Sequence, residues 1–110
     1  MISFNYLRKA FPNDPGLIEQ VVDIYISEYP EFISKFTYSV RNRDMEEVKK
    51  LVHKWQYTAK ILGLIGLQSD LMKLEEYSSL TSLEIDELTI AVLDSVEKNF
   101  DELKAYKIAS

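Results

Sequence analysis

The fold of this chain is indicated most directly by the stretch from Thr81 to Leu103, which reads TSLEIDELTIAVLDSVEKNFDEL. Thr81 followed by Glu84 three residues later is the pattern of a capping box at the start of a helix. Apolar side chains then recur at three- and four-residue steps, at Leu88, Val92, Val96, Phe100 and Leu103. Because this is the spacing of one face of an α-helix, the stretch predicts a long amphipathic helix with one buried side.

Ahead of this helix, the sequence predicts one short helix and one long helix. The short helix covers Ser3–Ala10, and residues 12–16, which read PNDPG, break the chain after it. Asp14 is predicted to cap the next helix, with Pro15 at its first position. That helix carries an aromatic stripe at helical spacing, which we interpret as core packing, and it contains Pro30, where we expect a kink.

Two more helices are predicted in the middle of the chain. Asp44 with Glu47 three residues later marks the start of a helix over Met45–Leu62, which Gly63 ends. Another begins at about Leu64 and ends near residues 77–80. Four long amphipathic helices with short connections predict an all-α fold, an antiparallel up-down-up-down four-helix bundle with a short additional N-terminal helix.

Length and composition favour one ordinary globular domain over residues 1–110, because the sequence contains no internal repeat or linker-like stretch. The absence of cysteine excludes disulfides and thiolate metal sites, and it fits a reducing compartment. No stretch approaches the roughly 20 apolar residues that span a bilayer, and the first nine residues lack the apolar run of a signal peptide. We therefore expect a cytoplasmic protein with no membrane partner.

Charge is unevenly distributed along the chain, whose net charge is −5. Residues 41–60 contain six basic and three acidic residues, a net charge of +3, so the rest of the chain carries −8. The acidic total argues against a nucleic-acid partner, which usually requires a basic footprint. The local basic segment indicates either a local anionic partner or an ordinary solvated helix face.

The only histidine, His53, is predicted to lie on the solvent face of the helix over Met45–Leu62. Counting about 100° per residue from His53 places Val48, Leu51, Val52, Trp55, Thr58, Ala59 and Leu62 on the opposite half, which is predicted to face the core. The neighbours of His53 on its own face are Lys49, Lys50, Gln56, Tyr57 and Lys60.

This placement narrows the chemistry available to His53. One histidine without cysteine or a Glu-x-x-His motif does not build the usual metal site of a bundle, so no metal is expected. The nearest carboxylate on the same face, Glu46, lies about two turns away, which is too far to orient the ring. Side chains from other helices remain possible partners of the His53 ring. An exposed imidazole among cations is suited to carry a phosphoryl group, whereas the alternative is an ordinary surface histidine.

The segment from His53 to Leu64 resembles the signature of histidine-phosphotransfer (HPt) domains. The residues that match the family pattern in register are His53, Trp55, Thr58, Ala59, Leu62 and Gly63. The resemblance extends over the whole chain, because the helix starts, the aromatic–acidic stretch and the Leu71–Leu74–Glu75 run fall where the family has counterparts.

The resemblance implies a phosphorelay intermediate of two-component signalling, which is a phosphocarrier rather than an enzyme with its own turnover. A receiver-domain aspartate would donate a phosphoryl group to His53 Nε2, and a second receiver would accept it. The implied partners are receiver domains of response regulators or hybrid histidine kinases. The chain would need no cofactor, since the receiver brings Mg²⁺, and we expect a monomer. Residues expected to stabilise the phosphoryl group or dock the receiver are Lys49, Lys50, Lys54, Gln56, Tyr57 and Lys60, with Gly63 structural.

Two positions depart from the family pattern. Gln56 stands where the family has lysine, and either Lys60 or Lys49 is a candidate to replace the lost charge. Tyr57 stands where the family has glycine, and its ring either lies back over His53 or turns into a groove between helices. These departures favour an alternative, a pseudo-HPt adaptor that binds receivers without carrying phosphate. A helical adaptor unrelated to signalling is the third hypothesis.

Overall fold

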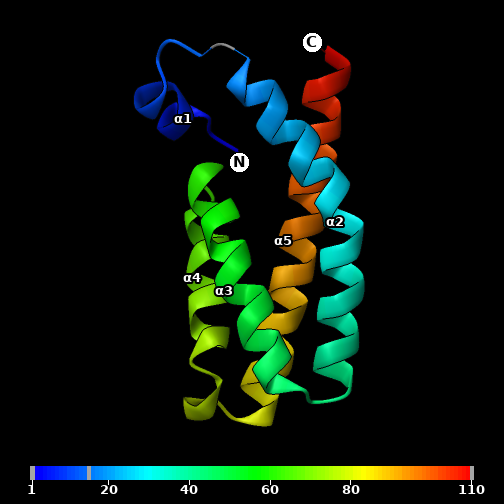
Figure 1. Ribbon diagram of the computed structural model, residues 1–110. Helices are drawn as coiled ribbons and strands as arrows, with labels where there is room; N and C mark the ends of the chain where they lie inside the picture. Colours follow the sequence, from blue (N-terminus) through cyan, green and yellow to red (C-terminus); the bar gives the residue numbers. More distant parts are fainter. Residues whose placement is uncertain (1, 15, 110) are drawn as a thin grey trace.

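The computed structural model describes residues 2–14 and 16–109, and every regular element within them is helical (Figure 1). In this part of the chain the elements are α1 (Asn5–Ala10), α2 (Leu17–Arg41), α3 (Met45–Ile61), α4 (Ile65–Glu75), the short 3-10 helix η1 (Tyr77–Ser79) and α5 (Ser82–Ala109). The prediction of an all-α fold is confirmed. None of these helices is long and apolar enough to cross a membrane.

Helices α2 to α5 lie side by side along the long axis of the molecule (Figure 1). Helix α3 packs mainly against α2 and α4, and α5 packs against the same two helices. The short α1 lies beyond the ends of α3 and α4 that meet at the turn after Ile61 (Figure 1). Each long helix therefore has two neighbours and an outer face, and α4 is the neighbour of α3 along one side.

Two helix starts that the sequence predicted are confirmed by their capping bonds. At α3, the backbone N–H of Glu47 donates to Oδ1 of Asp44 over 3.3 Å. At α5, the N–H of Glu84 donates to Oγ1 of Thr81 over 3.1 Å, and the N–H of Thr81 donates to Oε1 of Glu84 over 2.9 Å. Such bonds satisfy donors that the first helical turn leaves without partners.

The predicted start of α2 is wrong. The capping residue is Gly16, and no side chain caps the helix. Asp14 instead takes part in a turn, in which its carbonyl accepts the N–H of Leu17 over 3.2 Å, so its carboxylate lies too early in the chain to cap α2. Pro15 lies outside the described residues. Further along, α2 continues through Pro30 without a break.

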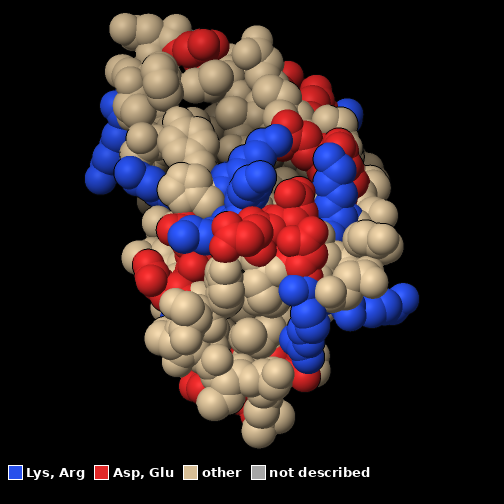
Figure 2. Space-filling model, turned by 60° about the horizontal axis from the view of Figure 1, so that its bottom comes forward, with Lys and Arg blue, Asp and Glu red and all other residues tan. Residues whose placement is uncertain are grey.

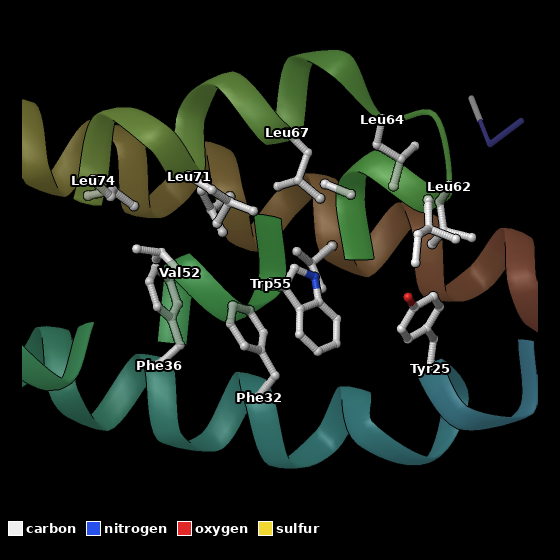
Figure 3. Close-up of a cluster of buried hydrophobic side chains, with 14 of the residues drawn as sticks. Tyr25, Phe32, Phe36, Val52, Trp55, Leu62, Leu64, Leu67, Leu71 and Leu74 are labelled. Atoms are coloured by element: carbon white, nitrogen blue, oxygen red, sulfur yellow. The ribbon is translucent and has the colours of Figure 1, made fainter. Parts of the chain in front are cut away.

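The aromatic stripe of α2 forms core packing, as predicted. Tyr25, Phe32 and Phe36 point towards Trp55 and Val52 of α3 (Figure 3). The rings of Phe32 and Trp55 are stacked with centroids 4.3 Å apart. The core half of α3 is thereby fixed, and the opposite half, which carries His53, faces away from α2 and α5.

Candidate functional site

His53 is exposed at the middle of α3, as the sequence predicted. Its side chain is 75% accessible, whereas its neighbour Val52 is fully buried. The imidazole ring is therefore exposed to water, while the backbone of His53 is held in a packed helix. Such a ring is accessible to another macromolecule without any change in the fold.

A carboxylate from the next helix holds one nitrogen of this ring. Nδ1 of His53 lies 2.6 Å from Oε1 of Glu75, the last residue of α4. Glu75 is largely covered, with 22% of its side chain exposed. An ionised carboxylate only accepts hydrogen bonds, so Nδ1 carries a proton, and in the neutral form of the ring Nε2 carries the lone pair. Among the described residues, Nε2 has no hydrogen-bond partner.

Sequence reasoning missed Glu75 as a partner of His53, because it considered carboxylates on the same helix and left other helices open. The available signal was that Glu75 directly follows Leu74, at the edge of the apolar face of α4. A residue at such an edge faces a neighbouring helix. Only the packing of α3 against α4 shows that the neighbour is His53.

Gln56 completes this cluster from α3. Its Nε2 donates to Oε1 of Glu75 over 2.9 Å, so His53 and Gln56 share one acceptor oxygen. Gln56 is half-buried, whereas His53 is exposed. The Gln56 amide therefore binds Glu75, whereas the sequence had predicted that it would contact a phosphoryl oxygen.

The electrostatics of Glu75 follow from these contacts. The hydrogen bond from His53 is the main reason that the pKa of the Glu75 carboxyl lies below its ordinary value of 4.5. The bond from Gln56 and the positive charge of Lys49 lower this pKa further, while partial burial opposes them. Glu75 is therefore ionised at neutral pH.

The lysines around His53 lie on different sides of α3. Lys49 is near enough to Glu75 for its charge to act on that carboxylate. Lys54 lies towards α2, where it lines a shallow groove with Glu31 and Lys35. Lys60 lies towards α1, with Nζ 5.8 Å from the centre of the Tyr6 ring. Lys50 is exposed.

The surface of the folded chain mixes both charges. On the face seen in Figure 2, acidic side chains gather in the middle, and lysines and arginines lie beside them. The basic segment over residues 41–60 thus has acidic neighbours such as Glu75 and Glu31, which come from other helices. A partner that meets α3 would contact lysines interleaved with carboxylates.

Tyr57 is exposed, with 62% of its surface accessible. Its ring is therefore not buried in a groove between helices. Tyr57 follows His53 by one helical turn and so projects from the same half of α3, and it lies near enough to Tyr25 of α2 for its charge to act on that side chain.

Gly63 terminates α3 in the left-handed conformation, with φ of +71°. The N–H groups of Leu64 and Gly63 donate to the carbonyls of Ala59 and Lys60, a Schellman motif. The N-terminal segment packs directly on this turn, and the N–H of Ser3 donates to the carbonyl of Leu62 over 2.7 Å. Ser3 thus lies outside α1, which begins at Asn5 rather than at the predicted Ser3.

No group of three or more histidine or acidic side chains is placed to hold a metal ion within residues 2–14 and 16–109. Comparisons with protein-family models, curated proteins and solved structures find no match for this chain.

Proposed function

We propose that this chain is a histidine-phosphotransfer protein, a phosphorelay intermediate that folds as an antiparallel up-down-up-down four-helix bundle with a short N-terminal helix. It would accept a phosphoryl group from a receiver-domain aspartate on His53 and pass it to another receiver. The single observation that carries the proposal is the exposed Nε2 of His53, with Nδ1 held by the Glu75 carboxylate. The motif register around His53 supports it independently.

The chemistry of the proposed transfer needs only a nucleophile from this chain. The lone pair of Nε2 attacks phosphorus, the phosphorus–oxygen bond of the acyl phosphate breaks, and the receiver's aspartate leaves as a carboxylate. The phosphorylated ring is then cationic, and Glu75 lies beside it as a counter-charge. Magnesium and the acidic pocket belong to the receiver, so this chain would act as a phosphocarrier without cofactor, as a cytoplasmic monomer.

Lys49 is the best placed cation to stabilise the bound phosphoryl group, because its charge already acts at the His53–Glu75 pair. Lys60 is the other cation in question, but its ammonium group is directed over the Tyr6 ring. Lys50 and Lys54 are more suited to docking, since they extend the exposed surface of α3.

The alternative is an adaptor that binds receivers without carrying phosphate. The exposed ring of Tyr57 favours it, because a bulky side chain one turn after His53 obstructs close approach of a receiver. The proposed relay and the adaptor share a docking surface and differ only in whether phosphoryl reaches Nε2.

Phosphoryl transfer from receivers tests the proposal. Receiver domains of the source organism, phosphorylated in the presence of Mg²⁺, should label this protein with an acid-labile, base-stable phosphoryl group. His53→Gln should abolish the label, and Glu76→Gln serves as a surface control because Glu76 is exposed and follows Glu75. If no receiver labels the wild-type protein although some bind it, the adaptor is correct. If none binds, neither signalling role holds.

A further inference from the structure

Helices α3 and α5 occupy diagonal corners of the bundle, because each packs mainly against α2 and α4 rather than against the other. The side of α5 that faces the core carries the buried residues Ile85, Val92, Val96 and Leu103. Counting about 100° per residue from Val92, the opposite side of α5 points out of the bundle, away from the helix that carries His53. The proposed phosphoryl transfer makes no use of this outer side.

Six residues form one line along the outer side of α5, at alternating four- and three-residue steps. They are all exposed, and we call them the outer stripe: Leu83, Glu87, Ile90, Asp94, Glu97 and Asp101. The same alternation relates the positions through which one helix packs against another in a coiled coil. Leu83 and Ile90, which lie two helical turns apart, are 67% and 69% exposed. The outer stripe thus presents two apolar side chains at a spacing that a second helix can cover.

The other four members of the outer stripe are carboxylates. Over its whole length, Ser82–Ala109, α5 carries seven acidic and three basic residues, whereas residues 41–60 carry the basic excess of the chain. Asp94 is paired with Lys98 over 3.0 Å, but Glu87 and Glu97 form no ion pair or hydrogen bond with any described residue. The outer stripe is therefore anionic, and two of its carboxylates are free to accept donors from another molecule.

The charge of the outer stripe determines what can cover it. Glu87 lies one turn from both Leu83 and Ile90, so a purely apolar surface laid on them would remove water from an unpaired charge, which is unfavourable. An acidic surface would be repelled. A helix with apolar residues two turns apart and lysine or arginine between them covers the apolar pair and supplies a charge-assisted bond to each free carboxylate. Charge complementarity thus selects a basic amphipathic helix.

We propose that the outer stripe of α5 is a docking surface for a basic amphipathic helix of a partner protein. The apolar residues of that helix pack on Leu83 and Ile90, and its cations meet Glu87 and Glu97. From Leu83 to Asp101 the stripe extends about 27 Å, which matches a partner helix of about 18 residues. The covered area is small and the charges are exposed, so binding is transient and weakens with salt.

A partner on the outer stripe leaves the ring of His53 open, because α3 and α5 lie at diagonal corners. The chain can therefore hold this partner and a receiver at once, which raises the effective concentration of the two for each other. The basic segment over residues 41–60 repels the same helix from the His53 face. No residue of the proposed phosphoryl-transfer site takes part in this surface, so docking and transfer can be tested separately.

Two fluorescent peptides test the docking surface on the intact protein. One is a helix of about 18 residues made of leucine and lysine heptads, with leucine at the packing positions, and the other has glutamate in place of lysine. Fluorescence anisotropy should show binding of the lysine peptide alone, with an affinity that falls as salt is added. Nitrogen-15 NMR should show the largest backbone shifts at the outer stripe.

Matched variants separate this surface from the general acidity of the protein. Ile90→Gln should weaken binding about tenfold, because an apolar contact is lost, whereas Ile65→Gln, at an 80% exposed position of α4, should not. Glu87→Gln should weaken binding severalfold in low salt and approach wild type in high salt, whereas Glu76→Gln, also at an exposed position, should bind like wild type. The helical circular dichroism spectrum should stay unchanged in all four variants.

Phosphoramidate shows whether docking and transfer are independent. It donates its phosphoryl group to histidine as the phosphorus–nitrogen bond breaks and ammonia leaves, so no receiver is needed. Saturating lysine peptide should leave the rate of His53 labelling unchanged, and His53→Gln should bind the peptide like wild type. If no receiver labels His53 but the peptide binds the outer stripe, the relay fails while the docking surface stands.

Three results would overturn the docking surface: the lysine peptide does not bind, its NMR shifts lie on other helices, or Ile65→Gln and Glu76→Gln weaken binding as much as the stripe variants. A peptide that slows labelling of His53 would likewise place it on the wrong face. Sedimentation of the protein alone tests a different occupant. Association that rises with concentration and is abolished by Ile90→Gln would assign the outer stripe to a second copy of this chain instead of a basic helix.

Discussion

At the scale of single residues, the hydrogen bond at Nδ1 of His53 determines which neutral form of the ring is favoured, and this form leaves the lone pair on Nε2. Glu75 contacts Nδ1, Gln56 donates to the same oxygen of Glu75, and the His53 side chain is exposed. The arrangement resembles the way carboxylates orient catalytic histidines, where the carboxylate fixes the ring and stabilises its cationic form.

The coupling between His53 and Glu75 can be measured on the carboxylate. In the wild-type protein, the Glu75 carboxyl should titrate below pH 4.5, because the bond from His53 stabilises its ionised form. A lowered pKa stabilises the folded state above pH 4.5, and this stabilisation is lost as the pH falls through the folded-state pKa. In His53→Ala, carbon-13 NMR should show the midpoint moving upwards. A midpoint that stays in place would show that the hydrogen bond does not form in solution.

Tyr57 is the second residue whose effect can be isolated. Because its ring is 62% exposed on the His53 side of α3, we expect Tyr57→Ala to speed phosphoryl transfer from a receiver several-fold. The rate with phosphoramidate should not change, since that donor is small enough to pass the ring. Slower transfer from the receiver would instead show that the ring makes a productive contact with the partner.

At the scale of the elements, helix boundaries depend on short-range contacts that a few residues encode. The Thr81–Glu84 box starts α5 with two reciprocal bonds, and Asp44 starts α3 with one. Such patterns involve residues three positions apart, so the sequence predicted them correctly. The prediction failed at Asp14, because the turn before α2 places that carboxylate ahead of the helix start.

The capping box of α5 should contribute measurably to stability. Thr81→Ala removes the acceptor for the N–H of Glu84, and we expect the free energy of unfolding to fall by about 1 kcal/mol. Urea denaturation followed by circular dichroism measures this difference. Ser82→Ala is the matched control, since Ser82 is exposed and makes no capping bond at the described start of α5. Equal losses in the two variants would contradict a specific role of Thr81.

At the scale of the whole molecule, contacts between distant parts of the chain join the ends of the helices. The N-terminal segment binds the end of α3 through Ser3 and Leu62, and Tyr77 of η1 donates to Glu46 of α3 over 2.5 Å. Gly63 lies at the first of these contacts. A Cβ atom added there would lie 2.9 Å from Cβ of Ser3, closer than side-chain packing allows.

Gly63→Ala and Gly66→Ala should therefore have opposite effects on stability. Gly63→Ala forces a left-handed residue and displaces Ser3, which should cost about 1–2 kcal/mol. Gly66 lies within α4 with open space around it, so Gly66→Ala should stabilise the fold by up to about 1 kcal/mol. Thermal unfolding measures both. Faster hydrogen exchange at the Ser3 amide should accompany Gly63→Ala alone, and loss of stability in both variants would contradict this account of Gly63.

The sequence by itself determined the helical class of this protein, the buried half of α3 and the exposure of His53. These features repeat every 3.6 residues or depend on neighbours in the chain, so they can be read locally. Only the tertiary structure decided that Glu75 meets Nδ1 of His53, that Gln56 holds Glu75 and that Lys60 turns to Tyr6. The reason is that helical periodicity fixes which face of a helix is buried, whereas the register of one helix against the next is set by how their side chains pack.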